Sequence, residues 1–186
     1  MSEKEQKEGV SAKEVLGLVV YFAVVILAMF LIIRFVGQRT EVEGQSMENT
    51  LSDGDNLIVD KISYRFKDPE RFDIIIFPYQ YEEDTYYIKR IIGLPGEKIR
   101  IDDDGNIYVN DEILNESYGR EVIQNPGIAR DEIQLEEDEY FVLGDNRNNS
   151  SDSRDPSVGI VCRSDIVGRA WLRIYPFKDF GFIKHQ

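Results

Sequence analysis

Three short polar stretches contain the residues that could do chemistry. The first is Gly44-Gln-Ser-Met-Glu-Asn-Thr-Leu51, in which Ser46 stands in a turn-like segment and Gly44 leaves room for close approach of a backbone. A serine becomes a nucleophile only when a neighbouring group removes its proton. Ser46 is therefore either a nucleophile or an ordinary turn residue, and the stretch alone favours the turn.

The chain offers few of the usual partners for a nucleophile. Its one histidine, His185, is next to the C-terminus, where chains usually fray. Its one cysteine, Cys162, excludes an internal disulfide and a Cys-rich zinc site. If the protein is a hydrolase, we expect a base other than histidine. We predict no metal site and no cofactor.

The second stretch, Tyr87-Ile-Lys-Arg-Ile-Ile-Gly-Leu-Pro-Gly-Glu97, contains a candidate base. Strand alternation places Lys89 on the same face as Tyr87 and Ile91, which would desolvate its amine. Desolvation lowers a lysine pKa, and a fall from about 10.4 to about 7–8 would make Lys89 a general base at neutral pH. The alternative is an edge-strand lysine with its amine in water.

The third stretch, Gly144-Asp-Asn-Arg-Asn-Asn-Ser-Ser-Asp-Ser-Arg154, follows the apolar run Phe141-Val-Leu143. A loop so rich in donors and acceptors can build a hydrogen-bonded shell around a site, with Asp–Arg pairs fixing its shape. The alternative is a solvated surface loop. A calcium site is disfavoured because the ligand spacing of an EF-hand is absent.

Together the three stretches resemble one family, the type I signal peptidases or leader peptidases, in their short bacterial form. The matching motifs are Ser46-Met47 with Thr50-Leu51, Lys89-Arg-Ile-Ile-Gly-Leu-Pro-Gly96, and Gly144 to Arg154. Order and spacing agree, and the resemblance covers about residues 15–178.

By this resemblance Ser46 attacks the scissile carbonyl and Lys89 is its base, a variant of the serine hydrolase constellation. Ser150 would orient the lysine. The family's structural loop residues correspond to Asp145, Arg147, Asp152 and Arg154.

The resemblance also implies an oxyanion hole and a substrate pocket. Some family members carry a second serine where this chain has Gly44, so the oxyanion would rest on the backbone N–H groups of Ser46 and Gly44. The substrates would be secretory precursor proteins with small residues at the first and third positions before the cut. The first pocket would be lined by Val42, Met47, Leu51, Tyr87 and Ile88.

An apolar run precedes the polar stretches. Val15 to Ile33 is 19 residues without a charge, and as a helix it would span about 28 Å, close to the roughly 30 Å hydrocarbon core of a bilayer. We therefore predict a transmembrane helix over 15–33, after a tail over 1–14 and before a juxtamembrane connection over 34–43. Flanking charges do not set the orientation. The resemblance implies a single-pass protein of the cell membrane, with a cytoplasmic N-terminus and an extracytoplasmic catalytic domain over 44–186.

The rest of the chain predicts short strands. Segments 56–60, 72–77, 85–92, 98–101, 106–109, 140–143 and 166–174 are β-branched or aromatic and are bounded by turn residues. The fold class is therefore mainly β, a signal-peptidase-type sheet core with a small insertion, preceded by one transmembrane helix. The C-terminal aromatics, among them Trp171, Phe180 and Phe182, either rest in the bilayer interface or pack on strands.

The net charge of the chain limits the classes of partner that it can bind. The net charge of −13 argues against a nucleic-acid binder. Residues 102–139 hold 13 Asp and Glu against two Arg, which predicts a solvated, peripheral segment, and we interpret 102–135 as a non-catalytic insertion. We expect precursor proteins and membrane lipid as partners and a monomeric chain.

Three rival hypotheses remain. An autocleaving repressor shares a Ser–Lys dyad but requires a DNA-binding segment. A sortase-like enzyme requires a Cys–His site. A membrane-anchored binding module without activity should have lost the serine, the lysine or the loop.

Overall fold

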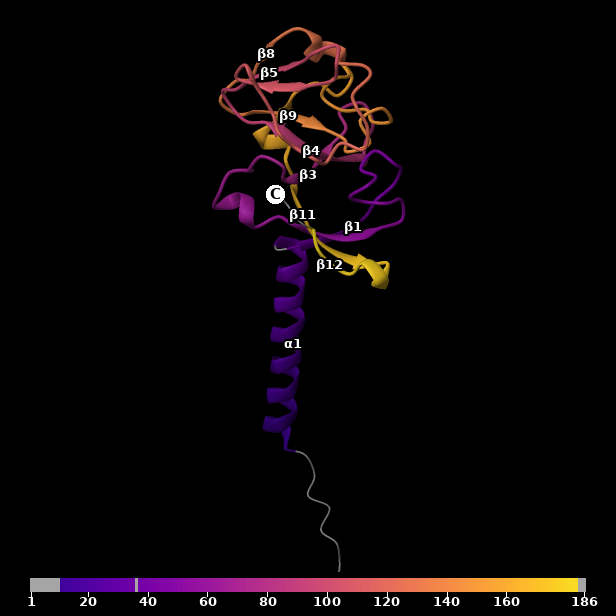
Figure 1. Ribbon diagram of the computed structural model, residues 1–186. Helices are drawn as coiled ribbons and strands as arrows, with labels where there is room; N and C mark the ends of the chain where they lie inside the picture. The colour runs from indigo at the N-terminus through magenta and orange to yellow at the C-terminus, as the bar shows by residue number, and fades with distance from the viewer. Residues whose placement is uncertain (1–10, 36, 184–186) are drawn as a thin grey trace, which may run out of the picture. The chain divides into compact units, whose positions relative to one another are not determined.

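The computed structural model describes residues 11–35 and 37–183, and the chain divides into two compact units between residues 36 and 37 (Figure 1). The first unit contains helix α1, Ala12–Phe35. Its stretch Lys13–Leu31 is long and apolar enough to cross a membrane, and every side chain of that stretch is exposed. The predicted apolar helix is confirmed, and it is longer at both ends than the uncharged run.

The second unit is built from antiparallel strands, which confirms the mainly β fold class. Its larger sheet has the order β1-β2-β11-β3-β4-β9-β10, and β12 pairs with β11. The strands are β1 Gly37–Glu41, β2 Asn56–Asp60, β3 Ile74–Pro78, β4 Tyr86–Gly93, β9 Glu139–Leu143, β10 Val161–Cys162, β11 Gly168–Tyr175 and β12 Gly181–Phe182.

A smaller sheet of four strands has the order β7-β6-β5-β8. Its strands are β5 Lys98–Ile101, β6 Ile107–Val109, β7 Glu112–Ile113 and β8 Ile133–Gln134. The two predicted strands 98–101 and 106–109 form a hairpin, since β5 pairs with β6 across the turn at Gly105, whose φ of 81° favours glycine. The 3-10 helices are η1 Ser63–Arg65, η2 Gly127–Arg130, η3 Arg163–Asp165 and η4 Phe177–Asp179.

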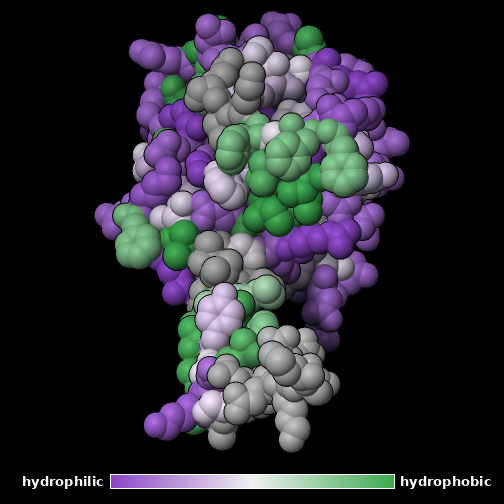
Figure 2. All heavy atoms as spheres, turned by 90° about the horizontal axis from the view of Figure 1, so that it is seen from below, coloured by the Kyte–Doolittle hydropathy of each residue, from purple (hydrophilic) through white to green (hydrophobic). Residues whose placement is uncertain are grey.

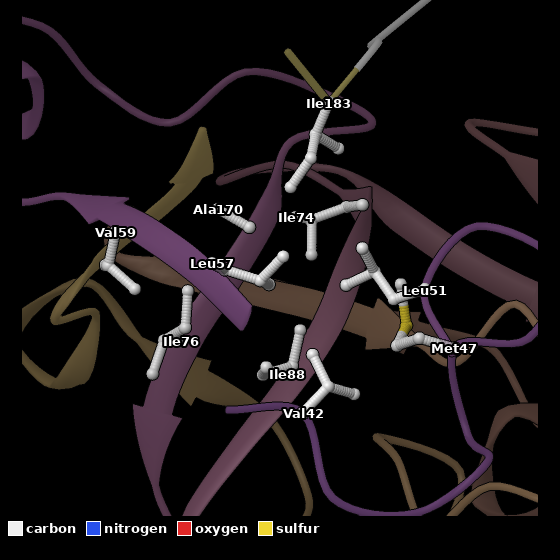
Figure 3. Close-up of a cluster of buried hydrophobic side chains, with 10 residues drawn as sticks. All are labelled: Val42, Met47, Leu51, Leu57, Val59, Ile74, Ile76, Ile88, Ala170 and Ile183. Atoms are coloured by element: carbon white, nitrogen blue, oxygen red, sulfur yellow. The ribbon is translucent and has the colours of Figure 1, made fainter. Parts of the chain in front are cut away.

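Alternation along the central strand β4 connects the parts of the core. Ile88, Ile91 and Ile92 belong to three different clusters of buried side chains. The cluster of Ile88 also contains Val42 and Met47, which flank Ser46 in the chain (Figure 3). The turn that carries Ser46 is therefore attached to the sheet by apolar packing on both sides of the serine.

Two segments are more ordered than expected from the sequence. The connection expected over 34–43 contains strand β1, which pairs with β2 from Gly37 to Glu41. The acidic stretch 102–135 is not peripheral, because it supplies three strands of the smaller sheet. Its apolar residues Ile107, Ile123 and Ala129 are buried in one cluster with Phe141 and Leu143 of β9. In this segment most acidic side chains lie on the outside, and apolar side chains anchor the segment to the core. The net charge of the segment does not reveal this arrangement.

Figure 2 shows hydrophobic side chains gathered in places on a surface that is otherwise mostly hydrophilic. Trp171 remains 41% exposed although it packs against Phe182, with ring centroids 5.1 Å apart. Packing on strands is thus confirmed for Trp171. Phe177 and Phe180 are largely exposed, and contact of these rings with a bilayer interface stays a prediction.

Candidate active site

A tight turn after Ser46 presents the serine. The N–H groups of Thr50 and Leu51 both donate to the carbonyl oxygen of Met47, at 2.9 and 2.8 Å. Met47 and Leu51 are buried, whereas Ser46 is only partly buried. The buried side chains of Met47 and Leu51 thus anchor the turn to the core. The hydroxyl of Ser46 lies between the sheet and solvent and stays accessible.

Strand β4 brings Lys89 to this hydroxyl. Lys89 Nζ lies 2.8 Å from Ser46 Oγ and 3.0 Å from the carbonyl oxygen of Ile88, and its exposed fraction is 4%. Tyr87, two residues earlier on the same face, has its ring centroid 4.9 Å from Nζ. The predicted desolvation of Lys89 is confirmed, and the serine and lysine are brought together across 43 residues of sequence.

Burial is the main influence on the lysine. It disfavours the ammonium form and holds the pKa of Lys89 down to about 8, although the carboxylates of Asp152 and Asp145 act in the opposite direction. About a tenth of the amine is therefore neutral at pH 7, far more than at the ordinary pKa of a lysine. Only the neutral form can accept a proton from a serine.

The loop after β9 closes over the two residues. Arg154 and Asp152 form a bidentate pair, with Nε–Oδ1 and Nη2–Oδ2 both at 2.8 Å. Asp152 also accepts from the N–H of Gly144 at 3.0 Å. Any side chain at Gly144 would overlap with Ser150 Oγ and the carbonyl oxygen of Ser46. The predicted Asp152–Arg154 pair is present, and glycine at 144 allows the loop to lie against Ser46.

Ser150 is close to this point but does not make the expected bond to the lysine. Its hydroxyl is buried and has no hydrogen-bond partner among the described residues. The two hydrogen bonds of Lys89 go to Ser46 and to the backbone instead. The orienting role of Ser150 stays a prediction.

Residues that sequence reasoning did not single out hold the loop to the turn. Asn146 donates from its backbone N–H to the carbonyl oxygen of Ser46 and from Nδ2 to that of Gln45, both at 3.0 Å. Asp145, which the resemblance places in the loop scaffold, pairs with Arg90 of β4. Asn146 stood in the motif, but nothing in its spacing showed what it would bind.

The Arg90–Asp145 ion pair is completely buried. Its Nη2–Oδ2 distance is 2.6 Å, its Nε–Oδ1 distance is 2.8 Å, and both side chains are 0% exposed. Thr50 donates to Asp145 as well, so the pair reaches the far end of the nucleophile turn. In the sequence, Arg90 stands within a run of isoleucines. A charge within such an apolar run indicates a buried carboxylate partner, and this was the signal that could have predicted the pair. Arg147 pairs instead with Glu116 at 2.8 Å.

A groove of about 540 Å³ opens in front of Ser46 and Lys89. Its lining includes Val42, Met47, Tyr87 and Ile88, as the resemblance implies. Leu51 was predicted there and is absent from the lining, because it is fully buried in the same cluster as Met47, beside that side chain (Figure 3).

Backbone donors for an oxyanion are fewer than expected. The N–H of Gly44 donates to Asp53 Oδ1 at 2.7 Å, so it is not free to bind an oxyanion. The N–H of Ser46 has no hydrogen-bond partner within the described part of the chain. The role of Gly44 in an oxyanion hole stays a prediction, and it would require release of this bond to Asp53.

Other chemistries find little support. Among residues 11–35 and 37–183, no group of three or more His, Cys, Asp and Glu side chains could hold a metal ion. Cys162 lies in β10 away from the groove lining, and burial is the first of the causes that raise its thiol pKa. His185 lies outside the described residues.

Comparison with known proteins agrees with the geometry. The family model described as signal peptidase, peptidase S26, matches residues 15–175. Signal peptidase I of Bacillus caldolyticus is 42% identical over 159 residues, covering 80% of this chain and 85% of that protein. The probable signal peptidase I-2 of Synechocystis sp. is 41% identical over 155 residues, covering 80% and 68%.

A solved structure of a signal peptidase I from Enterococcus faecalis is 34% identical, covers 55% of this chain and 97% of that chain, and has a TM-score of 0.44. The family match extends from the apolar helix to the last strands and includes all three polar stretches. The chain belongs to the signal peptidase I family, peptidase S26.

Proposed function

We propose that this protein is a membrane-anchored serine endopeptidase that removes signal peptides with a Ser46–Lys89 dyad. The observation that carries the proposal is the 2.8 Å contact between Lys89 Nζ and Ser46 Oγ, made by a lysine that is 4% exposed. A buried amine beside a hydroxyl on the wall of a groove has the position and the lowered pKa of a general base.

The chemistry runs in two halves. Neutral Lys89 accepts the hydroxyl proton while Ser46 Oγ bonds to the scissile carbonyl carbon. The C–N bond then breaks, and Lys89 gives that proton to the leaving amine, which leaves an ester on Ser46. In the second half Lys89 takes a proton from water, whose oxygen attacks the ester, and the proton returns to Ser46 Oγ. The products are a peptide carboxylate and the regenerated dyad.

The oxyanion is assigned to the free N–H of Ser46. Preorganised backbone donors stabilise the developing charge because they need not reorganise during the reaction. The N–H of Gly44 already donates to Asp53. A second hydrogen-bond donor to the oxyanion would therefore be a group of the bound substrate or a water molecule. When the oxyanion binds to the backbone N–H of Ser46, the scissile carbonyl lies between this N–H and Ser46 Oγ.

The groove suits an extended peptide. Strand β9 pairs with β4 only from Arg90 onward, so Tyr86 to Lys89 have no partner strand on that side. Strand β1 is at the sheet edge. A substrate strand can add to such free edges through backbone hydrogen bonds. Val42 and Ile88, which are buried side chains in the groove wall, leave room for small residues next to the cut.

The proposed partners are signal-peptide-bearing precursors and membrane lipid. Helix α1 would keep enzyme and membrane-inserted precursor in one plane and so raise their effective concentration. By analogy with the family, the N-terminus is assigned to the cytoplasm and the catalytic unit to the opposite side. The chain is assigned as a monomer.

The size of the first residue before the cut provides a direct test. Purified protein in lipid vesicles should cleave a precursor with alanine at the first and third positions at that single bond. Leucine at the first position should lower kcat/KM by about 100-fold, since its extra methylenes would collide with a preformed small pocket. Mass spectrometry of the products checks both results. Absence of cleavage, or equal cleavage of the two precursors, contradicts the proposal.

A further inference from the structure

A short part of the acidic stretch, Glu116 to Arg120, contacts the active-site scaffold at several points. Glu116 Oε1 pairs with Arg147 Nη1 at 2.8 Å, where the two side chains are 10% and 3% exposed. The N–H of Arg120 donates to the carbonyl oxygen of Asp145 at 2.9 Å. Arg120 Nη1 also lies 2.7 Å from Glu48 Oε2, two residues after the nucleophile. This segment therefore bridges the catalytic loop and the nucleophile turn.

Between these contacts, Tyr118 covers Arg90. The guanidinium carbon of Arg90 lies 3.6 Å from the centroid of the Tyr118 ring. Arg90 uses its N–H groups in the plane of the guanidinium, toward Asp145, Thr50 and the carbonyl oxygen of Phe72. In-plane bonds leave the flat face of a guanidinium open, and an aromatic ring attracts a cation at that face while excluding water.

The bonds of Arg90 lead to the nucleophile from two directions. Asp145 accepts from Thr50, whose N–H closes the turn onto Met47. The next residue, Asn146, holds the carbonyl oxygen of Ser46 itself. Movement of Arg90 would thus disturb the turn at both ends. A displacement of the order of 1 Å at the reacting atom is enough to slow an enzyme about 100-fold.

We propose that Tyr118 is a positioning residue for Ser46 and acts through Arg90 and Asp145. The proposal rests on the function assigned above. It gives the acidic stretch a role in catalysis, although none of its residues touches the reacting atoms. The face-on ring keeps the Arg90–Asp145 pair dry, and the dry pair keeps Ser46 at the distance from Lys89 at which proton transfer occurs.

Tyr118 should affect the geometry of the dyad without affecting the basicity of the lysine. Lys89 and Arg90 are consecutive in β4, so their side chains point to opposite faces of the strand. Burial is the largest cause that acts on the pKa of Lys89, and Asp145, the only one of the causes in the path from Tyr118, is the smallest. Loss of the Tyr118 ring therefore predicts a lower kcat, an almost unchanged KM, and a pH profile whose midpoint shifts little compared with the loss of kcat.

The test compares Tyr118→Leu, Tyr118→Phe and a matched control in the full-length protein in detergent. Tyr118→Leu removes the aromatic face and is expected to lower kcat about 10-fold, as loss of a desolvated cation–π contact would. Tyr118→Phe keeps the face and should stay within about two-fold of wild type. The control is Tyr108→Leu, whose ring covers Arg100 at 4.1 Å in the smaller sheet, and its kcat should match wild type.

Two results would overturn the proposal: a folded Tyr118→Leu protein with wild-type kcat, or an equal loss of kcat in Tyr108→Leu. If Tyr118→Leu does not fold, phenylalanine at 118 carrying one to three fluorines keeps the shape and weakens the attraction for a cation. The kcat should then fall with each fluorine, and a flat series refutes the proposal.

Lys89→Met, measured in the same assay, separates this inference from the proposed function. An inactive Lys89→Met beside a fully active Tyr118→Leu refutes only the role of Tyr118. An active Lys89→Met refutes the dyad itself, whatever Tyr118 does.

Discussion

Lys89→Met is expected to reduce cleavage of a fluorogenic Ala-x-Ala peptide to background, a loss of at least about 10⁴-fold in kcat, as for other members of a catalytic dyad or triad. Methionine has nearly the length of lysine and fills the same buried space, but it cannot accept a proton. The measurement is kcat in detergent from pH 6 to 10, with the enzyme concentration taken from folded protein.

The wild-type pH profile follows from the same lysine. Because the active form is the neutral amine, kcat should rise as pH increases through the lowered pKa of Lys89, about 8, and then level off. A profile without a rise near that pH would assign the base to another group. The control Lys98→Met replaces a half-exposed lysine of β5 that pairs with Glu132, and it should keep the wild-type profile.

The inactive variant should also be more stable. Lys89 has a lower pKa in the folded protein than in the unfolded chain, so folding is penalised while the unfolded chain holds the proton. The penalty is complete below pH 8 and disappears as pH rises toward the unfolded pKa of 10.5. Lys89→Met should therefore increase the free energy of unfolding by up to about 3 kcal/mol at pH 6 and by little at pH 10. A destabilised variant at pH 6 would contradict the burial argument.

The second large effect is expected for Asp145→Ala. This change leaves the guanidinium of Arg90 buried without its carboxylate, in a pair whose two side chains are 0% exposed. Breaking such a pair costs about 3–5 kcal/mol of unfolding free energy. It also releases Thr50 from the nucleophile turn, so kcat should fall by at least about 100-fold even in folded protein. Denaturant titration in detergent and peptide cleavage measure the two quantities.

Two further variants test whether the losses in Asp145→Ala are due to burial of the Arg90–Asp145 pair. Glu132→Ala breaks the Lys98–Glu132 pair, which has a similar distance of 2.7 Å but is 43% and 41% exposed, and it should cost at most about 1 kcal/mol. The double change Arg90→Met with Asp145→Leu should recover most of the stability and none of the activity, because apolar side chains can replace a buried pair in packing but cannot hold Thr50. Equal losses in Asp145→Ala and Glu132→Ala would show that burial of the pair is irrelevant.

Local patterns predicted the helix and most of the longer strands of this protein. An uncharged run of bilayer length predicted helix α1, and β-branched runs between turn residues predicted seven strands, each of which is present within about two residues. Alternation in β4 predicted that Lys89 would share a face with Tyr87 and lose water, which needs only the two-residue period of a strand. Strands β7, β8, β10 and β12 were missed because two residues are too few to show an alternation, and β1 was missed because its sequence, Gly37–Glu41, contains no apolar side chain.

The family motifs located the reacting residues, but they did not say what holds them. The resemblance assigned Ser46 and Lys89 correctly to one place, and Asp152 to Arg154. It did not reveal that Asp145 pairs with Arg90, that Asp53 occupies the amide of Gly44, or that Leu51 lies below the groove. Each of these depends on a partner or neighbour brought in by the folded chain.

The sequence by itself therefore determined the apolar helix and the strand pattern, because these depend on composition and on periods of a few residues, and its resemblance to the family named the two residues of the proposed dyad. Only the tertiary structure decided how the dyad is supported, since the contacts join residues 43, 55 and 95 positions apart. A strand period tells which face a side chain takes. Which loop covers that face, and whether a buried charge finds its partner there, depends on how the loops pack over the finished sheets.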